Sequence, residues 1–133
     1  METEKKIEIK TSSDIILARQ SSRDLANKLG FGSADQTRLA TAISELTRNV
    51  VQYAGVGRCT IQDISNKKMG IRVVVEDTGN GIENIEKAME DGYSTGSGMG
   101  MGLPAAKRLV TKFNIQSKKG QTKVTVEMVR LRR

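Results

Sequence analysis

A carboxylate and an amide stand four residues apart in the most regular stretch of the sequence. Apolar residues recur there at helical spacing and predict one helix from Ser33 to Gly55, with its buried face formed by Leu39, Ile43, Leu46, Val50 and Tyr53. Glu45 and Asn49 then lie one turn apart on a flank of that face. A carboxylate there can take a proton from a hydroxyl, and an amide oxygen can bind a hard cation. Ordinary amphipathic helices carry similar pairs, so the spacing alone leaves both interpretations open.

A second candidate is the acidic turn Asp77-Thr78-Gly79-Asn80-Gly81, which directly follows the apolar run Val73-Val74-Val75. An aspartate at the end of a strand can accept a hydrogen bond from an exocyclic amine. The two glycines allow the backbone to pass close to a planar ligand. Asp and Gly are also common in plain turns, which is the alternative interpretation.

Alternating glycines form the third candidate and precede a helix that opens at Leu103-Pro104. They are Gly96, Gly98, Gly100 and Gly102. Glycines before a helix N-terminus can present bare N–H groups and the positive end of the helix dipole to phosphate oxygens. No Lys-Ser or Lys-Thr follows, as a P-loop requires, and no strand immediately precedes, as a dinucleotide-binding turn requires. A flexible linker is the alternative.

The elements that must position these residues are predicted from periodicity and turn residues. We expect a strand at 3–10 and a helix capped by Ser12 or Ser13 that ends at Gly30, then the long helix, opened by a capping box at 33–36. Strand pairs are expected at 58–65 with 71–77 and at 114–117 with 122–131, separated by a glycine-rich loop with a short helix at 84–90 and by the Pro104 helix. This order predicts an α+β, two-layer sandwich with helices on one face of a mixed, mostly antiparallel sheet, formed by one domain over residues 1–133.

Composition excludes several classes of protein. The chain has 133 residues, no histidine and one cysteine, Cys59, which excludes histidine-dependent hydrolases, an internal disulfide and a cysteine-built zinc site. No apolar run is long enough to cross a membrane, so we expect a cytoplasmic protein without a membrane partner. The net charge is +7, but the basic residues are scattered without interleaved aromatic rings. This disfavours a nucleic-acid platform and favours acidic partner surfaces. Cys59 is expected to be a small buried strand residue.

Taken in order, the three motifs resemble the N box and the two glycine boxes of the Bergerat-fold (GHKL) ATPases, the superfamily of gyrase, Hsp90, histidine kinases and MutL. The resemblance covers nearly the whole chain. Within it, the short length and the stretch Ala42–Asn49 are similar to the small serine kinases of bacterial sigma-factor partner switching. Further segments resemble the stressosome switch kinases, the RsbT type, namely Gly30-Phe31-Gly32, Asp35-Gln36, residues 90–95, Gly102-Leu103-Pro104 and Lys107-Arg108-Leu109.

The resemblance implies a site for ATP or ADP and Mg2+. By analogy with the family, Glu45 is the general base and Asn49 a ligand of Mg2+, while Asp77 binds the adenine amine. Arg48 is a weaker candidate for a phosphate or partner contact. The remaining implied residues shape the adenine pocket (Gly79 and Gly81), contact phosphates from a mobile lid at about 83–100 (Gly98, Gly100 and Gly102), and reach adenine through water (Thr122).

The resemblance also implies partners. The family phosphorylates STAS-domain proteins on Ser or Thr, here those of a stressosome, and the released kinase activates a PP2C-type phosphatase. Two alternatives remain. One is an anti-sigma factor with serine kinase activity, and the other is a nucleotide-binding adaptor without catalysis.

Overall fold

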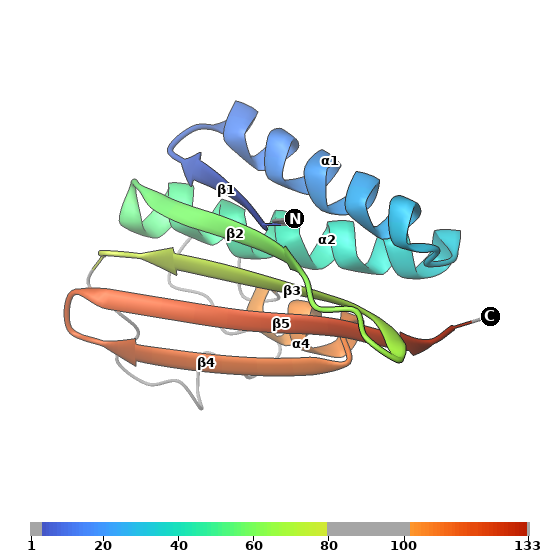
Figure 1. The fold of residues 1–133 in the computed structure, drawn as a ribbon. Coiled ribbons are helices and arrows are strands. Elements are labelled where there is room, and N and C mark those ends of the chain that lie inside the picture. Colours follow the sequence, from blue (N-terminus) through green and yellow to red (C-terminus); the bar gives the residue numbers. More distant parts are fainter. Residues whose placement is uncertain (1–3, 80–101, 133) are drawn as a thin grey trace.

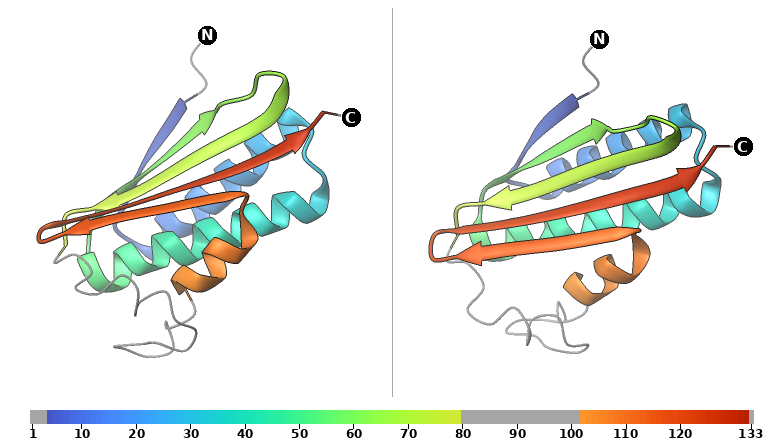
Figure 2. Two further views of the ribbon diagram at one scale, coloured as in Figure 1. Left: turned by 90° about the horizontal axis from the view of Figure 1, so that it is seen from below. Right: turned by 60° about the horizontal axis from the view of Figure 1, so that its bottom comes forward.

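The structure is a computed structural model and describes residues 4–79 and 102–132. Its strands form a five-stranded sheet in the order β1-β2-β3-β5-β4, in which every neighbouring pair is antiparallel. They are β1 (Glu4–Ile9), β2 (Gly57–Asp63), β3 (Lys68–Asp77), β4 (Lys112–Lys118) and β5 (Gln121–Leu131). One face of the sheet carries the helices α1 (Ser12–Leu29), α2 (Ser33–Asn49) and α4 (Gly102–Leu109), as Figures 1 and 2 show. The predicted α+β sandwich is confirmed.

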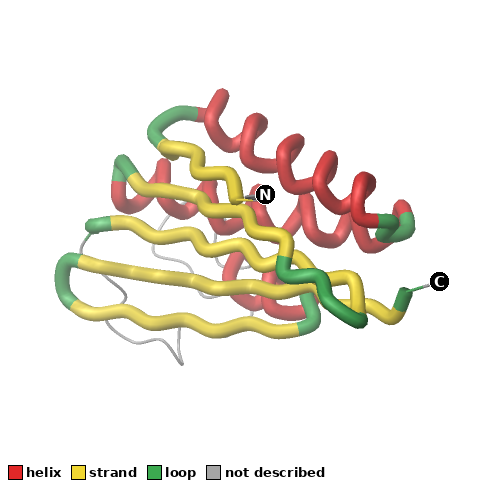
Figure 3. Tube along the Cα trace, viewed as in Figure 1, coloured by secondary structure: helices red, strands yellow, loops and turns green. Residues whose placement is uncertain are grey.

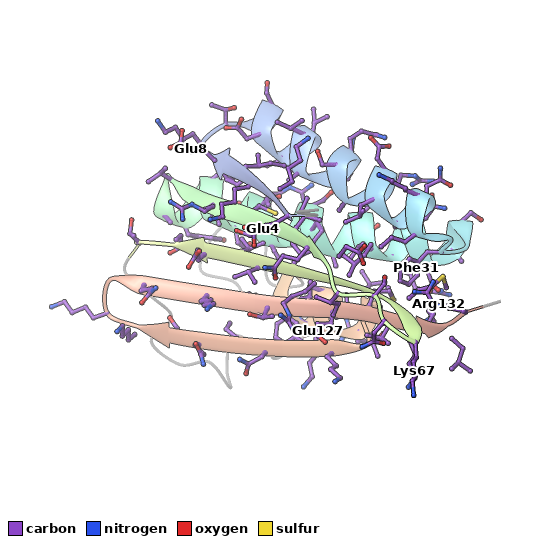
Figure 4. All side chains as sticks on the ribbon, viewed as in Figure 1. Glu4, Glu8, Phe31, Lys67, Glu127 and Arg132 are labelled. Atoms are coloured by element: carbon purple, nitrogen blue, oxygen red, sulfur yellow. The ribbon has the colours of Figure 1, made fainter. Side chains whose placement is uncertain are left out.

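The core lies between the sheet and the helices. Side chains alternate along β3, so that Ile71, Val73 and Val75 are buried under the helices while the residues between them face outward. The open face is polar: Arg72 donates to Glu127 of β5 at 2.8 Å, and Figure 4 labels Glu127 on this face. Helix α2 lies between α1 and α4 and packs against both. Glu45 and Asn49, the predicted site residues of α2, therefore lie on a helix that packs against α1, α4 and the sheet.

The expectation for Cys59 is confirmed. It lies on β2 with no exposed surface, and burial raises the pKa of its thiol to about 12. The thiol therefore stays protonated and unreactive at neutral pH.

Helix α1 begins one residue earlier than predicted. Thr11, rather than Ser12 or Ser13, is the N-cap residue. The Asp14 carboxylate accepts the backbone N–H groups of Lys10 at 2.9 Å and Thr11 at 3.0 Å, and these hydrogen bonds lower its pKa. The Asp14 carboxylate thus pairs with backbone N–H groups that precede the helix, and this fixes Ser12 as the first residue of α1. The helix ends as predicted, at Gly30 with φ 99°.

The capping box predicted at Ser33 is wrong. Gly32 is the N-cap residue of α2, and Ser33 is already helical. Asp35 instead forms ion pairs with Arg38 at 2.9 Å and with Arg130 of β5, whose Nε and Nη2 donate to its carboxylate at 3.0 and 3.2 Å. A contact between residues 95 positions apart therefore fixes the start of α2 against the sheet.

The C-terminal end of α2 continues without interruption into a π-helical turn, η1 (Val50–Ala54), which ends at Gly55 with φ 90°. Helix α4 begins two residues before Pro104, at Gly102. The predicted helix at 84–90 and the predicted lid lie outside the described residues. None of the helices in the described ranges is long and apolar enough to span a membrane.

Loops from both halves of the chain meet at one end of the sheet. The tube trace in Figure 3 places the turn after η1, the end of β3 and the β4–β5 turn at this end. At the opposite end lies the β2–β3 turn, where Lys67 points away from the body of the protein (Figure 4).

Replacing Asp35 by Asn tests the ion pair that anchors α2. Burial alone would raise the pKa of Asp35, but hydrogen bonds and charge from Arg130 and Arg38 outweigh it and hold the pKa below 3.8. A carboxyl group with a lowered pKa stabilises the fold above its unfolded-state pKa, and this contribution is lost as the pH falls through its folded-state pKa. We expect Asp35→Asn to lower the free energy of unfolding by about 1 kcal/mol at neutral pH.

Urea unfolding at a series of pH values measures this difference. It should stay constant from neutral pH to about pH 5 and shrink below pH 3.8. A difference that is the same at every pH would contradict an electrostatic origin.

Candidate active site

On the face of the sheet that the helices cover, residues paired across the strands form successive rows. The side chains change from apolar to polar in the last of these rows. The penultimate row of paired residues is Cys59, Val75, Val124 and Ile115. In the last row, the paired residues are Gly57, Asp77, Thr122 and Ser117. Because directly paired residues project to the same face, this row forms a polar strip where the core ends. It lies at the end of the sheet where the loops meet.

Asp77 is the acidic member of this strip and the last residue of β3. Burial raises the pKa of its carboxyl group, and the hydrogen bond from the Gly79 N–H to Oδ1 at 3.0 Å opposes that shift. A half-buried carboxylate with an incomplete set of donors is a strong acceptor for a ligand N–H group. The structure thus gives Asp77 the environment that amine recognition needs.

Two glycines allow close packing around Asp77. A Cβ atom on Gly57 would lie 2.5 Å from the Glu76 carbonyl oxygen and 3.2 Å from the Asp77 Cβ. A Cβ atom on Gly79 would lie 2.8 Å from the Cβ of Ala54 in η1. The turn after β3 therefore packs directly on the π-helical end of α2, and larger residues would force the two apart.

Thr122 lies opposite Asp77 across the β3–β5 pair and is nearly buried. Its hydroxyl group is 2.9 Å from the hydroxyl of Ser117 on β4. Ser117 was not predicted as a site residue, because it is far from the motifs in sequence. Only the register of β4 on β5 brings it to the strip.

The second part of the site lies where α2 meets the start of α4. A Cβ atom on Gly102 would lie 3.2 Å from Asn49 Nδ2, 3.4 Å from Asn49 Oδ1 and 3.5 Å from Glu45 Oε2. The structure therefore brings Glu45, Asn49 and Gly102 together. It places both side chains against the N-terminus of α4, where the backbone N–H groups lack helical partners.

Asn49 carries the clearest sign of a missing ligand. Its Oδ1 is buried and has no hydrogen-bond partner. Buried polar atoms are nearly always paired, so an unpaired amide oxygen is suited to a ligand such as a hard cation. Within residues 4–79 and 102–132 no group of three or more acidic, Cys or His side chains could hold a metal.

The π-helical turn connects the two parts. It begins directly after Asn49, packs Val50 under β2 and ends with Ala54 against Gly79. One continuous segment therefore carries the amide oxygen at one end and supports the Asp77 turn at the other. Three predicted site residues, Gly81, Gly98 and Gly100, lie outside the described residues.

This geometry agrees with comparisons to known proteins. Residues 34–132 match the model of the family described as histidine kinase-, DNA gyrase B-, and HSP90-like ATPase. The chain belongs to this ATPase family. A curated relative, serine/threonine-protein kinase RsbT of Bacillus subtilis (strain 168), is 47% identical over 116 residues, which cover 86% of this chain and 87% of the relative. This relative confirms the predicted class, a serine/threonine-protein kinase.

Solved structures of the ATPase family share the fold. The RsbU and RsbW domains of Rv1364c from Mycobacterium tuberculosis match with a TM-score of 0.66 and 19% identity, over 97% of this chain and 34% of that one. This chain thus spans about a third of that protein. The catalytic domain of histidine kinase ThkA matches with a TM-score of 0.58 and 16% identity, over 97% and 99% of the two chains.

Replacing Asp77 by Asn should separate ligand binding from stability. The raised pKa means that the ionised carboxylate costs free energy in the folded protein at neutral pH. We expect Asp77→Asn to leave the melting temperature unchanged or higher, while the affinity for ATP falls at least about tenfold because a charged acceptor is lost.

Thermal unfolding and calorimetric titration with ATP measure the two quantities. Asp63→Asn, on β2, is the matched control and should bind ATP normally. A variant that binds ATP as tightly as the wild type would exclude Asp77 from the nucleotide site.

Proposed function

We propose that the chain, as a single kinase domain over residues 1–133, transfers the γ-phosphoryl group of ATP to a serine or threonine hydroxyl of a protein. The observation that carries this proposal is the buried, unpaired Oδ1 of Asn49 beside Glu45 and the start of α4. An ATP-binding adaptor needs no carboxylate at that position. A kinase needs one there to receive the proton of the acceptor hydroxyl.

The nucleotide lies between the two parts of the site. Asp77 accepts a hydrogen bond from the exocyclic amine of adenine, and Thr122, opposite it in the polar strip, reaches the base through water. Gly79 and Gly81 would shape the adenine pocket, and Gly98, Gly100 and Gly102 would contact the phosphates through backbone N–H groups. The family membership supports this orientation.

In the transfer step, Glu45 takes the proton of the acceptor hydroxyl. The hydroxyl oxygen forms a bond to the γ-phosphorus while the bond from that phosphorus to the β–γ bridging oxygen breaks. The products are ADP and the phosphoprotein, and the proton on Glu45 returns to solvent. Because this chemistry depends on positioning and charge stabilisation, a chain without histidine can carry it out.

Asn49 would hold Mg2+ through Oδ1, together with oxygens of the triphosphate. When bound, the ion neutralises charge on the phosphates. The amide fits this ion because Mg2+ prefers oxygen ligands and is commonly shared with substrate phosphates. Packing of Asn49 against Gly102 fixes the amide in place.

The partners follow from the resemblance and from the RsbT relative. We propose that the substrates are STAS-domain proteins of a stressosome, and that the released kinase activates a PP2C-type phosphatase in the cytoplasm. The net charge of +7 supports acidic partner surfaces, because opposite charge accelerates encounter.

Replacing Glu45 by Gln tests the proposed base. Glutamine keeps the shape of the side chain but cannot take the proton, so we expect phosphate transfer to fall by at least about a hundredfold. ATP binding should remain, because Asp77 and Asn49 are unchanged. Incorporation of labelled phosphate into a STAS-domain protein measures transfer, and calorimetry measures binding.

Asp24→Asn, at an exposed position of α1, is a control for the loss of a negative charge. Normal transfer by Glu45→Gln would refute the role of Glu45 as base. Loss of binding along with transfer would assign Glu45 to the nucleotide site instead.

A further inference from the structure

Glu45 is held by a cation from its own helix. The Nη1 of Arg48 donates to Glu45 Oε1 at 3.0 Å, and the two residues are three positions apart. Within the described ranges, no other Lys or Arg forms an ion pair with this carboxylate. Arg48 thus contacts the proposed base directly but belongs to neither glycine motif.

The two carboxylate oxygens of Glu45 have different surroundings. Oε1 is occupied by the guanidinium of Arg48, whereas Oε2 lies on the side of Gly102, 3.5 Å from the position of a Cβ there. Asn49 borders the same point. One oxygen is therefore engaged on the helix surface, and the other is directed toward the place where α4 begins.

We infer that Arg48 is a positioning residue for the phosphoryl transfer. It fixes the Glu45 carboxylate through Oε1 so that Oε2 is the atom that takes the proton of the acceptor hydroxyl. This inference rests on the proposed function of Glu45 as base. It concerns the orientation of the base, not the binding of nucleotide or acceptor.

We expect the Arg48–Glu45 ion pair to affect the orientation of the Glu45 carboxylate more than the stability of the fold. The side chains of Arg48 and Glu45 are 45% and 24% exposed, and ion pairs of such exposure stabilise a fold by well under about 1 kcal/mol. Catalysis is more sensitive, since a displacement of about 1 Å can cost about a hundredfold in rate. The planar, five-donor guanidinium orients a carboxylate better than an ammonium group does.

The same helix offers a matched control. Arg38 donates to Asp35 at 2.9 Å with the same spacing of three residues, and its side chain is 50% exposed. Asp35 keeps its second partner, Arg130, when Arg38 is removed. Arg38→Met therefore breaks an equivalent ion pair at the other end of α2, away from Glu45.

The experiment compares the kinetics of Arg48→Met, Arg48→Lys and Arg38→Met in the full-length chain, with a STAS-domain protein as acceptor. We expect Arg48→Met to lower kcat about tenfold while the KM values for ATP and acceptor stay within about twofold. Arg48→Lys should recover part of kcat, because an ammonium group restores the positive charge but not the planar arrangement of donors in the guanidinium. Arg38→Met should match the wild type, and melting temperatures should agree among all variants.

Other outcomes would overturn the inference. An unchanged kcat in Arg48→Met would show that the pair does not orient the base. A raised KM for the acceptor with normal kcat would make Arg48 a docking contact, and a raised KM for ATP would make it a phosphate contact. If the wild type itself transfers no phosphate, the proposed function fails and the inference fails with it.

Discussion

A buried amide oxygen without a hydrogen-bond partner is costly, and this protein keeps one at the contact between its two site helices. Asn49 can hold Oδ1 there because Gly102 has no side chain, which lets the first residue of α4 lie against the amide. Burial of that oxygen costs a fold roughly 1–3 kcal/mol when it stays unpaired. A ligand that pairs with this oxygen regains that free energy, so the unpaired oxygen of Asn49 favours ligand binding.

The rest of the fold holds both ends of the helical segment that carries Asn49. Arg130 anchors the start of α2 to β5, and η1 carries its other end onto the turn after β3. The last row of the sheet then supplies Asp77 and Thr122. Helix α2 and its continuation η1 thus contact both α4, beside Glu45 and Asn49, and the turn after Asp77 at the end of the sheet.

Local sequence patterns predicted the order of the described helices and strands, and they singled out Glu45, Asn49 and Asp77, whose roles stay predictions. The spacing of Leu39, Ile43 and Leu46 defined α2 and placed Glu45 and Asn49 on one flank, and Pro104 marked α4 to within two residues. The failures arose from contacts between distant residues. Gly32 rather than Ser33 is the N-cap residue of α2, whose first turn Arg130 holds through Asp35, and Ser117 reaches Thr122 only through the β4–β5 register. The π-helical form of residues 50–54 has no pattern of its own and accompanies the packing of Ala54 on Gly79.

Calorimetric titration with ATP, in the presence and absence of Mg2+, decides whether the unpaired oxygen of Asn49 binds the metal. In the wild type, Mg2+ should tighten ATP binding by about tenfold or more, since pairing a buried oxygen is worth at least about 1.4 kcal/mol. In Asn49→Ala, binding without Mg2+ should persist through Asp77, while the gain from Mg2+ disappears. An equal gain from Mg2+ in both proteins would contradict the assignment of Asn49 as the ligand.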